Sequence, residues 1–176
     1  MMRKLLLAVA AAIAFFLIYV AFQPAYGTVM RTAVLAAPPE AIFPHINSLK
    51  NWNAWSPWAK LDPAAKAVFA GPETGPGAEF TWSGNRDVGT GKMTILESDP
   101  NKRVKINLDF QKPMASTSIA EFTLQPEGTG TRVTWVMSGE RGYAARLVCA
   151  LFNADRMVGN MFEKGLANLG AAASKP

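Results

Sequence analysis

The residues of this chain that could carry chemistry are mainly aromatic. Three of the five tryptophans, Trp52, Trp55 and Trp58, stand within the eight residues 51–58. An indole offers a large apolar area and one N–H that needs an acceptor when it is buried. Trp52 and Trp55 are three residues apart, so one helical turn places them on the same side, and Pro57 favours a bend before Trp58. The pattern predicts a short helical turn followed by a bend, with the indoles packed either against the domain core or against an apolar ligand.

Groups suited to catalysis or metal binding are few. The chain has one histidine, His45, one cysteine, Cys149, and no paired acids at ligand spacing, so we expect no metal and no cofactor. A serine nucleophile could use only His45 as its base, and no Gly-x-Ser-x-Gly elbow is present. Glu79 and Glu121 alternate with phenylalanines that should face inward, so no inward acid is evident for enolate chemistry. These patterns disfavour enzymatic activity without excluding it.

The N-terminal segment predicts a membrane span. Residues 5–22 contain no charge and no polar amide, and such a run forms roughly 27 Å of helix, about the thickness of bilayer hydrocarbon. Arg3 and Lys4 precede it, so the positive-inside rule predicts a single-pass cell-membrane protein with a cytoplasmic N-terminus and its domain on the periplasmic or extracellular side. The alternative is a cleaved signal peptide, although its apolar region usually spans only about 7–15 residues. Either alternative exports the rest of the chain.

The remaining charge and cysteine content point to no polyanion partner. Two of the five net positive charges belong to Arg3 and Lys4, and the other basic residues are scattered, so nucleic-acid binding is not expected. A lone Cys149 cannot form an internal disulfide, and we expect it to be a buried side chain on a helix. We therefore divide the chain into an anchor or signal peptide at 1–23, a linker at 24–30, one domain at 31–170 and a tail at 171–176.

Hydrophobic spacing predicts the elements of this domain. A first strand at 31–36 leads into a short helix that opens at Pro38-Pro39-Glu40 and contains Pro44. From residue 67 apolar residues alternate with polar ones between hairpin turns, which predicts an antiparallel meander with one solvated face. Residues 147–169 return to a three-to-four spacing typical of a helix, broken near 153–155. Gly159 and Gly165 each cost about 1 kcal/mol in a helix, which makes sense where the helix closely approaches the sheet.

Three segments within residues 31–170 resemble the START-like, polyketide cyclase-type (SRPBCC) superfamily: 37–43, 51–58 and 159–169. The resemblance implies an α+β helix-grip fold, in which a curved antiparallel sheet wraps around a long C-terminal helix and a hydrophobic cavity. Here an N-terminal transmembrane helix would precede that fold. The superfamily includes lipid carriers and polyketide cyclases, so the resemblance implies function only at the level of apolar ligands.

We therefore expect a membrane-anchored, exported domain that binds, or binds and transports, a lipid or another hydrophobic small molecule in an internal cavity. One alternative is a polyketide cyclase- or dehydratase-like enzyme, which requires a buried ionisable side chain facing the cavity. Another is an envelope scaffold, which requires exposed indoles in the tryptophan segment. The expected ligand contacts are inward-facing aromatic and methionine side chains, which line cores and apolar pockets alike: Trp52, Trp55, Trp58, Phe80, Trp82, Met93, Phe110, Met137, Met157 and Met161.

Overall fold

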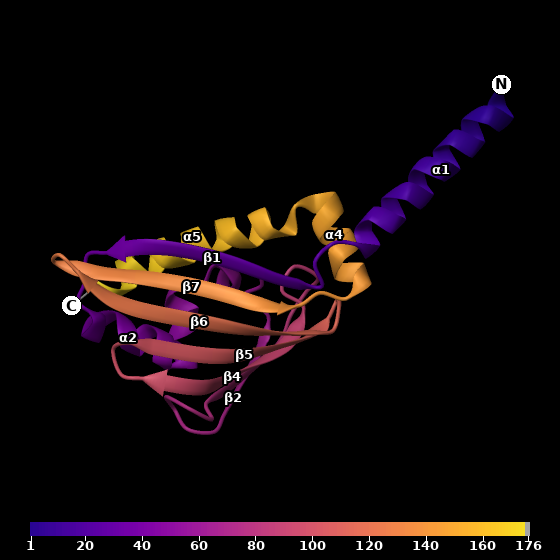
Figure 1. Cartoon of the computed structure of the whole chain (residues 1–176). Helices are drawn as coiled ribbons and strands as arrows, with labels where there is room; N and C mark the ends of the chain where they lie inside the picture. The colour runs from indigo at the N-terminus through magenta and orange to yellow at the C-terminus, as the bar shows by residue number, and fades with distance from the viewer. Residues whose placement is uncertain (175–176) are drawn as a thin grey trace.

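A computed structural model describes residues 1–174 as one curved sheet with helices on its inner face (Figure 1). All neighbouring strands are antiparallel, in the order β1-β7-β6-β5-β4-β3-β2. The strands are β1 Tyr26–Leu35, β2 Lys66–Ala70, β3 Glu79–Ser83, β4 Thr90–Asp99, β5 Arg103–Lys112, β6 Ser116–Glu127 and β7 Gly130–Glu140. The helices are α1 Met2–Ala21, α2 Pro39–Asn47, α3 Trp52–Trp55, α4 Tyr143–Phe152 and α5 Ala154–Ala173, with 3₁₀ turns η1 Leu49–Asn51 and η2 Pro57–Lys60.

This architecture confirms the predicted α+β helix-grip fold. The long helix α5 packs against β1, α2 and α3, and the hairpin-linked strands β3 to β7 follow the predicted meander. Strand β5 shows the expected alternation, because Val104, Ile106 and Leu108 are buried while the residues between them remain partly exposed. One face of the sheet is therefore apolar and faces α5, and the other faces solvent.

The boundaries of the first strand and the last helix differ from those expected. Residues 26–30, interpreted as part of a linker, belong to β1, where Tyr26 pairs with Glu140 and Met30 pairs with Val136. The reason is the length of β7, which extends far enough to give this segment a backbone partner along its whole course. Helix α5 continues through the expected domain end at residue 170 to Ala173, so only Ser174 of the expected tail is described outside the helix, and residues 175–176 lie outside the described residues.

Helix α1 projects away from the domain (Figure 1). Within residues 1–174 it is the one helix both long and apolar enough to cross a membrane, with a mean hydropathy of 2.4 and almost all of its side chains exposed. This is compatible with a single-pass anchor and equally with a signal sequence.

The two glycines predicted to mark a close approach do so, but with different neighbours. A Cβ atom at Gly165 would lie 2.8 Å from the Trp135 ring and 3.3 Å from the Pro57 ring. At Gly159 its three nearest neighbours would all be atoms of the Arg31 guanidinium. The first neighbours are fixed in the core, whereas a long arginine side chain can move aside.

We therefore expect the two Gly→Ala substitutions to differ clearly in their effect on the free energy of unfolding. Gly165→Ala should destabilise the domain by about 1–3 kcal/mol through overpacking. Gly159→Ala should be neutral or stabilising by up to about 1 kcal/mol, because alanine is the better helix former. Urea denaturation followed by circular dichroism measures both; equal losses at the two positions would contradict the packing described here.

The only histidine provides a test of packing at the C-terminal end of α2. Burial lowers the pKa of His45 below its ordinary value of 6.5, and His45 Nδ1 is buried without a hydrogen-bond partner among residues 1–174. The folded protein therefore binds fewer protons at this site than the unfolded chain, and stability should fall as the pH drops through about 6.5. Lys105 and Arg103 lower the pKa of Glu97 below its ordinary value of 4.5. The contribution of Glu97 to stability is therefore lost only in more acidic solution, below about pH 4.5, outside the range in which His45 titrates.

His45→Gln should consequently flatten the stability profile between about pH 5.5 and pH 7.5. The measurement is the urea midpoint of the wild type and the variant at several pH values in that window. An unchanged slope in the variant would mean that another group causes the dependence.

Candidate functional site

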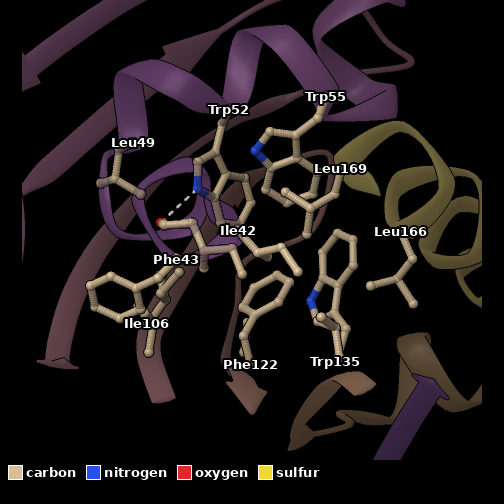
Figure 2. Close-up of a cluster of buried hydrophobic side chains, with 14 of the residues drawn as sticks. Ile42, Phe43, Leu49, Trp52, Trp55, Ile106, Phe122, Trp135, Leu166 and Leu169 are labelled. Carbon is tan, nitrogen blue, oxygen red and sulfur yellow. Dashed lines mark hydrogen bonds between the residues drawn. The ribbon is translucent and has the colours of Figure 1, made fainter. Parts of the chain in front are cut away.

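The tryptophan segment closes the C-terminal end of helix α2. Trp52 Nε1 donates to the Ile46 carbonyl at 3.0 Å, and Trp55 Nε1 donates to the His45 carbonyl at 2.9 Å. The last carbonyls of a helix have no partner inside the helix, so these indoles satisfy acceptors that would otherwise be unpaired. Figure 2 shows the two indoles side by side above the sheet, with the Trp52 hydrogen bond dashed. The segment is thus a structural connection between α2 and the core.

The same indoles fill the middle of the domain. The Trp52 and Trp55 ring centroids are 4.7 Å apart, and each ring meets the Phe122 ring edge-on. Trp135 on β7 lies beside Phe122 and stacks on Phe162 of α5, with 4.0 Å between centroids and nearly parallel planes. Trp52, Trp55, Phe122, Trp135 and Phe162 are all buried. This half of the space between sheet and helix is closed core (Figure 2).

The other half of the inner face is covered less completely. Phe69, Phe80, Trp82 and Phe110 form a continuous row of aromatic rings across β2, β3 and β5, with successive centroids 5.0, 5.9 and 5.9 Å apart. Only Trp82 is buried, and the other three are partly exposed. We call six of the partly exposed apolar residues packed against this core the open apolar patch; they are Trp58, Phe69, Phe80, Phe110, Met137 and Val158.

The strand register explains why these side chains share one face. Phe69 pairs with Phe80, Phe80 pairs with Met93, and Met93 pairs with Leu108, and directly opposed residues of a sheet point to the same side. Further along the same row stand the small residues Ser118 and Gly139. Large aromatic groups therefore lie at one end of the row and little side-chain volume at the other.

The predicted contact residues fall into three groups in the structure. Trp52 and Trp55 belong to the closed core, and Met93 and Trp82 are buried beneath the patch. Four others belong to the open apolar patch: Trp58, Phe80, Phe110 and Met137. Met161 is partly exposed on α5 and does not belong to the patch. Met157 is exposed near the start of α5. The sequence analysis missed Phe69 and Val158, although the alternation in the strand and the helical spacing include both.

The polar groups near this face suit binding better than acid–base catalysis. All thirteen acidic residues lie within the described part of the chain, and none of them is buried. Arg31 of β1 pairs with Glu163 of α5 at 2.5 Å and joins the edge of the sheet to the helix. Residues 1–174 contain no group of three or more His, Cys, Asp or Glu side chains that could hold a metal ion.

One polar atom in the closed core lacks a partner. Trp135 Nε1 is buried and donates to no acceptor within residues 1–174. Leaving such a donor unpaired costs about 1–3 kcal/mol, a cost that the packing of the surrounding rings offsets. Trp135 also contacts Trp58, a member of the open apolar patch, through rings 6.0 Å apart.

Two hollows on the described surface lie away from the centre of the patch. One, of about 160 Å³, lies between η1 and the β2–β3 connection and borders on Phe69. The other, of about 480 Å³, lies over the adjoining ends of β6 and β7, near Tyr26 and Gly142. Both open to solvent, and neither is an enclosed apolar chamber of the kind that holds most of a small ligand.

Comparison with known proteins agrees with this architecture. Residues 27–174 match the family model described as polyketide cyclase/dehydrase and lipid transport. The chain has no match among curated proteins.

Solved structures of similar shape come from several bacteria. A Rhizobium leguminosarum protein gives a TM-score of 0.62 at 18% identity, with 86% of this chain and 96% of that chain covered. Protein MLL2253 from Mesorhizobium loti gives 0.61 at 21%, covering 83% and 96%. Protein CV1439 from Chromobacterium violaceum gives 0.59 at 18%, covering 85% and 98%. At these identities the similarity shows the fold alone.

Proposed function

The chain belongs to the polyketide cyclase/dehydrase and lipid transport family, and this membership supports hydrophobic ligand binding in general. We propose that its open apolar patch binds a lipid or a similar hydrophobic molecule. The observation that carries this proposal is the uneven cover of the inner face. One half is closed by the tryptophan core, while the other leaves several large apolar side chains partly exposed along one row. A bound apolar chain would complete that cover.

The energy available from the patch is sufficient for binding. Each methylene group removed from water contributes about 0.8 kcal/mol, so ten methylenes laid along the aromatic row contribute roughly 8 kcal/mol. Association costs at least about 4 kcal/mol in lost freedom of motion. The balance is at most about 4 kcal/mol, which corresponds to weak, millimolar affinity and suits a carrier that must release its ligand.

We further propose that α1 is retained as the anchor, with the N-terminus in the cytoplasm and the domain on the opposite side of the membrane. The domain contacts the C-terminal end of this helix through hydrogen bonds. Arg146 Nη1 of α4 donates to the Ala21 carbonyl at 2.8 Å and to the Gln23 carbonyl at 3.1 Å. A cation at a helix C-terminus complements the helix dipole, and α1 has no basic residue of its own in its last turn.

The alternative functions receive no specific support. A cyclase-like enzyme requires a buried ionisable group facing the ligand; no acidic side chain of this chain is buried, and His45, whose Nδ1 is buried, lies in α2 outside the open apolar patch. A scaffold that binds a partner through the tryptophan segment requires exposed indoles, but Trp52 and Trp55 are buried and Trp58 is only partly exposed. Hydrophobic binding needs neither feature.

Photo-crosslinking of the full-length chain in lipid nanodiscs tests the proposal. Two hydrophobic probes are suitable: palmitic acid with a diazirine in its chain, and the small aromatic 3-trifluoromethyl-3-phenyldiazirine. After illumination, mass spectrometry of peptides should locate adducts in β3, β5, β7 and the first half of α5. Adducts confined to α1 and α4 with both probes would overturn the proposal, because the probes would then report only the bilayer.

A further inference from the structure

Helix α4 is an apolar helix that the domain leaves uncovered. None of its residues is buried, although its sequence from Tyr143 to Phe152 contains a single charged residue, Arg146. Leu151 is 56% exposed and Phe152 65% exposed, and Met157 in the next helix is 62% exposed. Val148 lies three residues before Leu151 and four before Phe152, so it shares their face of the helix, and it is also exposed. An apolar stripe of this kind costs free energy in water.

The three-to-four spacing of this helix led to the expectation of a buried Cys149. That side chain is only half-buried, because α4 has no covering element on its outer side. The same spacing that marks a core-facing helix thus occurs here on a helix that faces outward.

The position of α4 indicates what covers it. The Tyr143 hydroxyl donates to the Leu17 carbonyl at 3.0 Å, and Arg146 caps the carbonyls at the end of α1. These α1 atoms belong to the last turns of the membrane-length helix, where hydrocarbon gives way to headgroups. Figure 1 shows α4 at the base of α1, at the end of the domain from which α1 departs.

The polar residues around α4 suit the headgroup region. Tyrosine is enriched at that depth because its ring is apolar and its hydroxyl is polar, and Tyr143 has both a partner on α1 and an exposed ring. The guanidinium of Arg146 lies 5.8 Å from the centre of the Tyr143 ring. Arg156, in the first turn of α5, is exposed beside the apolar stripe. Basic groups near an amphipathic helix attract anionic lipid headgroups.

We infer that α4 is an interfacial helix: Val148, Leu151, Phe152 and Met157 enter the leaflet on the domain side of the bilayer that α1 spans. The inference rests on the proposed anchor and not on the proposed ligand. It brings the start of α5 to the membrane surface. Val158 of the open apolar patch follows Asn153 by five residues, or about 7.5 Å of helix. A lipid leaving the bilayer would then have a short path to the patch.

The test uses the full-length chain with single cysteines, in vesicles of phosphatidylethanolamine and phosphatidylglycerol. In a Cys149→Ser background, Leu151→Cys and Phe152→Cys place a nitrobenzoxadiazole label on the apolar stripe. Asn160→Cys, at an exposed polar position of α5, is the matched control, and Ala12→Cys reports on α1. All four positions are exposed, so the labels leave the core intact, which circular dichroism verifies.

The labels at 151 and 152 should be quenched by lipids that carry a nitroxide near the ester group. They should also be protected from aqueous iodide by about threefold or more relative to the label at 160. The label at 12 should be quenched by lipids with a nitroxide deep in the chain. If 151 and 152 behave like 160 while 12 is quenched, the interfacial role of α4 is wrong and the anchor stands. If 12 is not quenched either, the anchor and the interfacial role are both wrong; crosslinks within the patch report the ligand site separately.

Discussion

Trp55→Ala should lower the free energy of unfolding by about 3–5 kcal/mol, the range found for large-to-small changes in a packed core. The indole is fully buried between Trp52, Phe122 and Trp135, so its removal leaves a cavity that the surrounding rings cannot close. It also leaves the His45 carbonyl without its donor. Because domains of this size are stable by only about 5–15 kcal/mol, the loss should be visible as partial unfolding near physiological temperature.

Trp58→Ala is the matched control for this prediction. Trp58 is half-buried and belongs to the open apolar patch, so its removal should cost clearly less than that of Trp55. Urea denaturation followed by far-ultraviolet circular dichroism gives both values under the same conditions. Equal losses for the two variants would contradict the division of the inner face into a closed half and an open half.

Phe110→Glu should reduce photo-crosslinking of the palmitic acid probe to the patch by at least about tenfold, which corresponds to about 1.4 kcal/mol of binding free energy. An acyl chain laid over Phe110 would force the new carboxylate out of water without a partner, at a cost of several kcal/mol. The side chain is only half-buried, so the fold should survive the change.

Val68→Glu is the control for the second prediction. Val68 precedes Phe69 in β2, so it points to the opposite face of the sheet, and it is 62% exposed. The added charge is the same, but the patch is untouched. Wild-type crosslinking in both variants would mean that the probe binds elsewhere, and a loss in both would indicate a general effect of charge.

Sequence patterns predict much of this fold because local rules govern its elements. Alternation identifies β5, the spacing of three identifies the pair Trp52 and Trp55, and the two glycines of α5 identify a close approach to the sheet. At the break expected near residues 153–155, Asn153 caps α5 and accepts a hydrogen bond from the Arg156 backbone N–H. Each of these signals lies within a few residues of the chain.

The division of the inner face could not be predicted in the same way. Alternation predicts that Trp135 points inward. It does not predict that Phe162, from a helix far along the chain, stacks on Trp135 with 4.0 Å between ring centroids and closes this half of the inner face. Helical spacing likewise gives an apolar stripe to α4, whose outer side the domain leaves exposed. The start of β1 depends on the length of its partner β7. These features depend on contacts between segments far apart in the chain.

The central claim, an apolar ligand on the open half of the inner face, is tested most directly by methyl NMR of the eight methionines. Met137 belongs to the open apolar patch, whereas Met30 and Met114 are exposed outside it. With full-length protein in nanodiscs and palmitic acid as the added probe, the methyl signal of Met137 should shift in a saturable manner while those of Met30 and Met114 stay in place. Shifts confined to Met30 and Met114, or no saturable shift at Met137, would contradict the account.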